Sequence, residues 1–142
     1  MYQKILVALE NGPADESLLP HVGELAQRLG SHLLLVHVAD GWAARHYDDF
    51  QLKESEEMKA DRLYLDTQAE LLRAKGLQVA TLLALGNPPD EILKTAIQEK
   101  CDLIAMATHG HRFLGDIIYG TTIAEVRHKA PMPLLLVRAA KV

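Results

Sequence analysis

The sequence predicts one α/β domain, spanning residues 1–142, in which a doubly wound five-stranded parallel sheet carries helices on both faces. Apolar runs of strand length alternate along the chain with segments of helical periodicity, which is the order that βαβ units require. Most of these runs are nearly continuous, as in strands that are buried on both faces. The length of 142 residues fits a single domain that needs no disulfide or structural metal to build a core.

The strands are expected at the apolar runs, which cover residues 5–9, 33–38, 79–85, 103–107 and 134–137. Apolar residues recur at helical spacing between them, over residues 18–29, 65–72, 92–97 and 123–129. Gly30 and Gly76 follow the first two helices, where glycine commonly adopts the left-handed conformation that ends a helix. Pro20 fits the first turn of the first helix if Ser17 is its N-cap, because amides of the first turn have no partner within the helix.

Two strand orders satisfy this pattern, the flavodoxin-like order 2-1-3-4-5 and the Rossmann-like order 3-2-1-4-5, and we take the second as the prediction. Both orders place the last strand at an edge of the sheet, and proteins usually cover an exposed apolar edge. Doubly wound sheets bind ligands beyond the carboxyl ends of their strands, where the strand order reverses. The loops that follow Leu9 and Ala107 are therefore the expected site.

Composition and charge exclude several classes of protein. The formal net charge is -4, and the charge-rich residues 53–62 mix both signs, so no basic stripe is available to bind duplex nucleic acid. No apolar run approaches the length of a membrane span, and the first residues enter a strand directly instead of forming a signal peptide. Cys101 is the single cysteine and is expected to be a buried, inert thiol. We expect a cytoplasmic protein that binds neither nucleic acid nor membranes.

Residues 40–52 form a long connection that holds Trp42, His46, Tyr47 and Phe50 among charged residues. A connection of this length is often a lid or a disordered excursion. The sequence leaves both interpretations open.

A glycine-punctuated turn, residues 106–122, follows the fourth expected strand and leads into the last helix. This context is typical of a loop that binds an anion, because the free amides at the start of a helix point toward it. Gly110 and Gly120 let the backbone approach a ligand closely. Thr121 and Thr122 place hydroxyl groups beside the expected helix start, where phosphate oxygens would fit.

A second interpretation of Thr122 competes with this one. Thr122 and Glu125 have the spacing of a capping box, so the last helix would begin at Ile123. If Thr122 is only an N-cap, Thr121 is the better candidate for a phosphate ligand. Glycines in a surface loop can also serve turns alone.

With these residues the chain resembles the universal stress protein family, whose nucleotide-binding members carry Gly-x-x-Gly, nine residues, and then Gly-Ser/Thr. The corresponding residues are Ala107-Thr108-His109-Gly110, residues 111–119, and Gly120-Thr121. The resemblance runs nearly end to end, through Lys4-Ile5-Leu6-Val7-Ala8, Leu35-Val36-His37-Val38, Gly86-Asn87-Pro88 and Lys129-Ala130-Pro131-Met132-Pro133-Leu134-Leu135-Leu136-Val137. Together these segments are more specific than the glycines alone.

The resemblance implies a site for an adenine nucleotide. Val38 and Met106 would flank the adenine, Gly110 would approach the ribose and phosphates, and Gly120 with the two threonines would hold the phosphates. Glu10 stands where the family usually has aspartate, near the base and any metal. The predicted nucleotide-binding residues are Ala8, Leu9, Glu10, Val38, Met106, Ala107, His109, Gly110, Gly120, Thr121 and Thr122.

Two residues depart from the family pattern. Ala107 replaces the first glycine of the motif, but an alanine at a strand end needs no unusual backbone angle, so only its methyl group matters to a ligand. Glu10 replaces aspartate, and its extra methylene shifts the carboxylate. Glu10 can still reach a metal or a water molecule, or it is a solvated carboxylate at the end of a loop.

The histidines have less specific interpretations. His109 and His111 lie two positions apart without a third ligand nearby, so they predict no metal site. His111 and Arg112 are either positive charges for a triphosphate tail or solvated loop residues. His37 lies inside an apolar strand, where a hydrogen-bonded structural histidine is commoner than a catalytic one.

The predicted function is that of an ATP-binding regulatory protein of the stress response, with or without Mg²⁺. The resemblance also implies a homodimer that pairs through the last strands. No Walker lysine follows the glycines and no nucleophile elbow is present, so we predict no catalytic residue. The alternatives are a slow ATP hydrolase and a nucleotide-free dimeric interaction scaffold, and Ala107 favours the scaffold.

Overall fold

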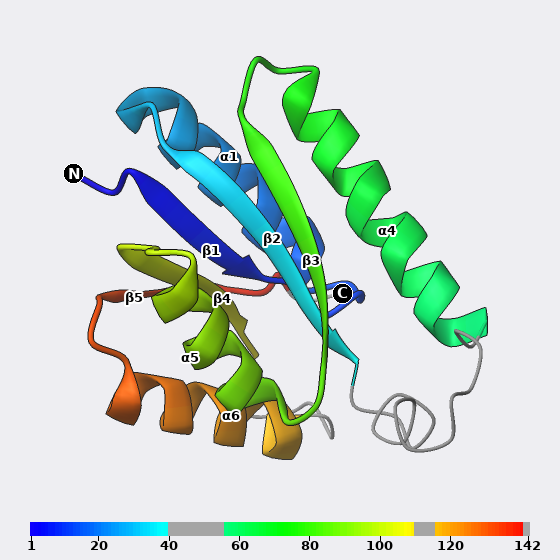
Figure 1. Cartoon of the computed structure of the whole chain (residues 1–142), viewed down its shortest axis with the longest axis vertical. Coiled ribbons are helices and arrows are strands. Elements are labelled where there is room, and N and C mark those ends of the chain that lie inside the picture. The colour runs from blue at the N-terminus through cyan, green and yellow to red at the C-terminus, as the bar shows by residue number, and fades with distance from the viewer. Residues whose placement is uncertain (40–55, 110–115, 141–142) are drawn as a thin grey trace.

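The computed structural model describes residues 1–39, 56–109 and 116–140 and contains a five-stranded parallel sheet. In chain order its elements are β1 (Lys4–Ala8), α1 (Asp15–Leu29), β2 (His32–Ala39), α4 (Glu56–Arg73), β3 (Val79–Leu85), α5 (Pro88–Gln98), β4 (Leu103–Thr108), α6 (Asp116–Lys129) and β5 (Leu134–Arg138). The strand order is β3-β2-β1-β4-β5 (Figure 1). The predicted fold class and the order 3-2-1-4-5 are confirmed, and the order 2-1-3-4-5 is wrong.

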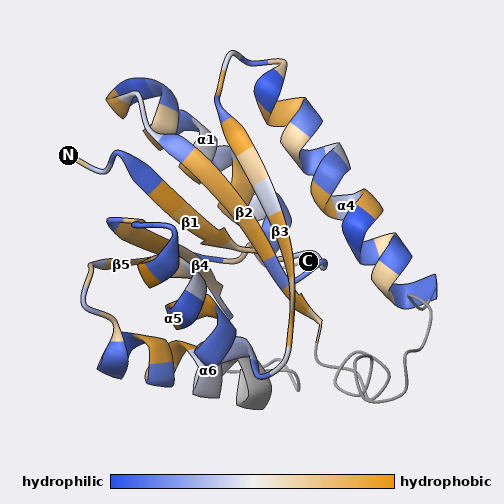
Figure 2. Ribbon diagram, in the orientation of Figure 1, coloured by the Kyte–Doolittle hydropathy of each residue, from blue (hydrophilic) through white to orange (hydrophobic). Residues whose placement is uncertain are grey.

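The sheet lies between two layers of helices. α1 and α4 pack on one face, and α5 and α6 pack on the other (Figure 1). The side chains of β1 alternate between the layers, since Ile5 and Val7 face α1 and α4 whereas Leu6 and Ala8 face α5 and α6. Figure 2 shows β1 and β2 as almost continuously apolar, as strands covered on both faces must be. Among the helices of the described residues, none has the length and apolarity needed to cross a membrane.

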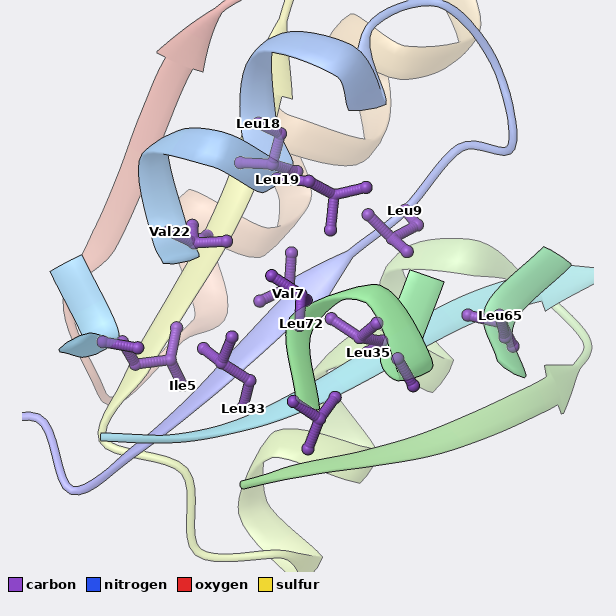
Figure 3. Close-up of a cluster of buried hydrophobic side chains, with 14 of the residues drawn as sticks. Ile5, Val7, Leu9, Leu18, Leu19, Val22, Leu33, Leu35, Leu65 and Leu72 are labelled. Atoms are coloured by element: carbon purple, nitrogen blue, oxygen red, sulfur yellow. The ribbon is translucent and has the colours of Figure 1, made fainter. Parts of the chain in front are cut away.

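α1 and α4 approach each other closely over β1 and β2 (Figure 3). Leu18, Val22 and Ala26 recur at helical spacing along α1 and are completely buried. Gly23 lies on the same side of α1, and a Cβ atom at this position would lie 3.3 Å from Cδ2 of Leu72 in α4. The small residue therefore sets how closely the two helices pack.

β3 is more exposed than its apolar sequence predicts. Its odd-numbered residues face α4, whereas Ala80 and Leu82 lie on the opposite face and are exposed, Leu82 by 39%. The reason is its place at the edge of the sheet, where it pairs with β2 alone. Its apolar run resembles that of a central strand, so the sequence pattern did not reveal the exposed face.

The ends of the helices agree only partly with the prediction. Gly30 and Gly76 follow α1 and α4 with φ angles of 70° and 89°, the left-handed conformation expected of them. The prediction that Ser17 caps α1 is wrong, because the helix already begins at Asp15. Pro20 therefore lies beyond the first turn, on the exposed side of α1, where water can bind the carbonyl that loses its amide partner.

Candidate functional site

A cavity opens at the point where the strand order reverses. β1 lies between β2 and β4, so the crevice at the carboxyl ends of β1 and β4 is the switch point of this sheet. The cavity there has a volume of about 250 Å³. Three strand ends and the helices α5 and α6 supply its lining, which consists of Ala8, Leu9, Glu10, Val36, His37, Val38, Pro88, Ile92, Met106, Ala107, Thr122 and Ile123.

Most of the predicted site residues meet at this cavity. Its lining includes Ala8, Leu9, Glu10, Val38, Met106, Ala107 and Thr122. His109 lies beside it, in contact with Glu10. Gly120 and Thr121 are exposed and are not among the lining residues. Gly110, His111, Arg112 and the segment 40–52 lie outside the described residues.

The sequence did not identify five residues of the lining as site residues, namely Val36, His37, Pro88, Ile92 and Ile123. Val36 lies two positions before Val38 and faces the same side of β2, so the alternation of a strand could have identified it. Pro88 and Ile92 lie one turn apart at the start of α5. They reach the cavity because α5 packs against β2, a contact that no local sequence pattern reveals.

The wall of the cavity is chiefly apolar. Aliphatic side chains and the thioether of Met106 come from β2, β4, α5 and α6, and the polar side chains on the lining are Glu10, His37 and Thr122. Apolar walls with a few placed polar groups are typical of small-molecule sites. Such a lining suits a ligand that combines an apolar ring with a few polar groups.

Glu10 and His109 form a hydrogen-bonded pair across the crevice. Nε2 of His109 lies 2.8 Å from Oε1 and 2.9 Å from Oε2 of Glu10. Ala8 and Met106 are paired in the sheet, so Glu10 and His109 follow neighbouring strands and meet just beyond their ends. Their side chains are only 13% and 16% exposed. The structure therefore shows Glu10 engaged by the protein and not as a solvated loop carboxylate.

Asp15 fixes the backbone of the loop that carries Glu10. Its carboxylate accepts hydrogen bonds from the amides of Glu10 (3.0 Å) and Asn11 (2.9 Å) and from the hydroxyl of Tyr64 (2.6 Å). Burial and the hydrogen bond to Asp15 raise the pKa of Tyr64 well above its ordinary value. Asp15 itself is 1% exposed. It thus begins α1 and holds the end of β1 in place.

His37 has the structural role that the sequence predicted for it. Its Nδ1 lies 2.8 Å from the carbonyl oxygen of Leu9, which can only accept a hydrogen bond, so Nδ1 carries a proton. Its Nε2 lies 3.5 Å from Oδ2 of Asp61 in α4. Asp61 also accepts a hydrogen bond of 2.7 Å from the side-chain amide of Asn11. These contacts connect α4, β2 and the loop after β1.

The start of the last helix corrects the prediction for Thr121 and Thr122. α6 begins at Asp116, well before Ile123, so Thr122 and Glu125 do not form a capping box at its start. The amides without helical partners belong to the first turn, and both threonines lie farther along the helix. Thr122 is 7% exposed and lines the cavity, whereas Thr121 is exposed. Helical geometry continues through Gly120 because a glycine weakens a helix without breaking it.

Comparisons with known proteins agree with this architecture. The family model described as "Universal stress protein family" matches residues 1–138. A universal stress protein of Thermus aquaticus is 31% identical over 144 residues, which cover 97% of this chain and 100% of that protein. The universal stress protein MJ0577 of Methanocaldococcus jannaschii is 27% identical over 155 residues, with coverage of 97% and 96%.

Solved structures show the same fold. The structure of MJ0577 superposes with a TM-score of 0.78 and 26% identity, and covers 100% of this chain and 99% of that chain. A universal stress protein from Archaeoglobus fulgidus, solved in complex with dAMP, superposes with a TM-score of 0.70 and 21% identity, with coverage of 96% and 98%. By sequence and by fold, the chain belongs to the universal stress protein family.

Proposed function

We propose that this chain binds an adenine nucleotide, ATP in the first place, in the cavity at the switch point of the sheet. The observation that carries the proposal is the convergence of Val38, Met106, Ala107 and Thr122 on one cavity. The family resemblance assigns Val38 and Met106 to the base, and Thr122 to the phosphates. The apolar wall suits a purine ring, and Thr122 from α6 offers a hydroxyl group at the same cavity.

The biological role proposed here is that of a cytoplasmic regulatory homodimer of the stress response. Membership of the universal stress protein family supports the stress role. The Archaeoglobus fulgidus relative in complex with dAMP has the same fold, and its ligand supplies a natural probe alongside ATP. The C-terminal strand β5 lies at an edge of the sheet, where a second copy of the chain can pair with it.

The test measures adenine-nucleotide binding by isothermal titration calorimetry. Val38→Trp would fill the cavity from β2, and we expect it to weaken ATP binding at least about tenfold, which corresponds to about 1.4 kcal/mol. Leu63→Trp is the matched control, since Leu63 is 68% exposed on α4, which packs on the other face of the sheet from the cavity. Circular dichroism establishes that both variants are folded.

Two results would contradict the proposal. One is ATP binding that Val38→Trp leaves unchanged, because the ligand would then lie elsewhere. The other is a wild-type chain that binds no adenine nucleotide while Ala107→Gly does. Ala107 contributes to the cavity lining, while its methyl group packs in the core on the α1 and α4 face of the sheet. That second result would make the natural chain an interaction scaffold.

A further inference from the structure

The Glu10–His109 pair crosses the crevice in which the proposed nucleotide lies. Nε2 of His109 is nearly equidistant from the two carboxylate oxygens of Glu10, at 2.8 Å and 2.9 Å. It therefore occupies the space between these oxygens, where a cation would sit if it bound the carboxylate through both of them. Because both side chains are largely buried, bulk water does little to compete with this contact.

The other described carboxylates near the end of β1 are also engaged by donors of the protein. Asp15 accepts hydrogen bonds from two backbone amides and from Tyr64. Asp61 accepts one from Asn11 and lies against His37. Each of these carboxylates already has the hydrogen-bond partners that a buried charge requires.

A divalent cation cannot bind Glu10 through both of its oxygens in this arrangement of side chains. Mg²⁺ needs a nearly octahedral shell of oxygen ligands at about 2.0–2.1 Å, and imidazole is not its preferred ligand. Within the part of the chain that the structure describes, no group of three or more His, Cys, Asp or Glu residues could hold a metal ion. To bind Glu10 through both oxygens, a cation would first have to displace His109.

We propose that His109 takes the place of a divalent cation on Glu10, so that the nucleotide's phosphates are bound without a metal ion held by this carboxylate. The inference rests on the proposed nucleotide site. A carboxylate beside phosphate groups needs a donor or a positive charge to offset the repulsion between like charges. The ring N–H of His109 supplies that donor from the chain itself. Glu10 is then a positioning residue for His109 and not a metal ligand.

The test compares how Mg²⁺ changes ATP affinity in wild type, E10Q, H109A and the double variant E10Q/H109A. Calorimetry gives the dissociation constant for ATP in excess MgCl₂ and in EDTA, and the ratio of the two constants is the Mg²⁺ response. Binding of Mg²⁺ to ATP in solution contributes equally to this ratio in every variant. Differences in the Mg²⁺ response between the variants therefore measure the contribution of Glu10 to Mg²⁺ binding. H32A is the matched control, since His32 is exposed and lies at the opposite end of β2.

We expect the Mg²⁺ responses of wild type, E10Q and H32A to agree within about twofold, because residues that do not share a ligand act independently. H109A removes this donor from between the two oxygens of Glu10 and should gain a Mg²⁺ response of about fivefold or more, the size of a typical coupling between bound ligands. The double variant should lose this gain. A wild-type response clearly larger than that of E10Q would overturn the inference, and so would an H109A response equal to that of wild type.

The remaining outcomes separate this inference from the nucleotide site itself. ATP binding that needs Mg²⁺ in wild type and loses that need in E10Q contradicts the inference but leaves the site intact. No binding of ATP, AMP or adenosine in either buffer overturns both. If H109A does not fold, the comparison of wild type with E10Q still tests the inference. E10Q should keep the fold, because a glutamine oxygen at position 10 can accept the same hydrogen bond from His109.

Discussion

Tyr64 and Asp15 form a contact between α4 and the start of α1 at which a single proton affects the stability of the fold. The Tyr64 hydroxyl donates to a carboxylate that is 1% exposed. Burial and this hydrogen bond raise the pKa of Tyr64. The folded chain therefore holds the tyrosine proton more tightly than the unfolded chain does.

The sign of the pH dependence follows from that difference. The stabilisation is complete below the pKa of an unfolded tyrosine, about 10, and is lost as the pH rises from there toward the higher pKa of the folded state. Tyr64→Phe should lower the free energy of unfolding by about 1–2 kcal/mol at neutral pH, since it removes a hydrogen bond to a charged group. It should also reduce the loss of stability in alkaline solution.

Urea unfolding between about pH 7 and about pH 11 measures both effects of Tyr64→Phe. Tyr2→Phe is the control, because the hydroxyl of Tyr2 has no hydrogen-bond partner among the described residues. If the free energy of unfolding falls equally steeply with alkaline pH in wild type and in Tyr64→Phe, the Tyr64 proton does not contribute to stability.

The residues of the site could be predicted only where strand ends define them. Glu10 follows β1 and Ala107 lies near the end of β4, so the rule for doubly wound sheets identifies both. The pairing of Glu10 with His109 joins positions 99 apart, and it depends on the lengths of two loops. The local sequence does not show where those two loops place the side chains of Glu10 and His109. The same holds for Pro88 and Ile92, which α5 brings to the cavity.

At the scale of elements, strands were easier to predict than helix starts. The five apolar runs lie within a residue or two of β1 to β5. In β1, β2 and β4 the reason is burial on both faces, which leaves a continuous apolar signature. α1 and α6 both begin before the predicted residue. Asp15 begins α1 with its carboxylate bonded to the preceding loop, so a search for a side chain that caps its own helix overlooked it.

Gly120 provides a test of α6 as an element of the site. It is exposed inside the helix, and a Cβ atom there would meet no heavy atom within 4 Å. Gly120→Ala should therefore raise the free energy of unfolding by about 0.5–1 kcal/mol, the cost of a glycine within a helix. If the backbone at Gly120 approaches the phosphates, as the family resemblance implies, the same change should weaken ATP binding.

Thermal unfolding and calorimetry of one Gly120→Ala sample separate these two effects. Ala124→Gly is the control, since Ala124 is exposed on the same helix and should lose stability without a change in ATP affinity. A Gly120→Ala variant with wild-type ATP affinity would remove Gly120 from the set of nucleotide contacts.

At the scale of the whole molecule, the sheet has two edges of similar exposure, and the proposed dimer uses only one of them. Leu136 of β5 is 41% exposed and Leu82 of β3 is 39% exposed. Leu136→Lys should raise the dimer dissociation constant at least about tenfold, because it places a charge in the proposed interface. Leu82→Lys makes the same change on β3 and should leave the dimer intact. Sedimentation velocity distinguishes them, and a monomeric wild type would contradict the proposed pairing through β5.

The Asp15 carboxylate also has a kinetic consequence. The backbone amides of Glu10 and Asn11 donate hydrogen bonds to the Asp15 side chain at the start of α1. They can therefore exchange hydrogen with water only when the start of that helix opens. Loop residues usually exchange quickly and independently of their neighbours. Here the loop beside the cavity belongs to the same cooperative unit as α1, and a ligand that protects one from exchange should protect the other.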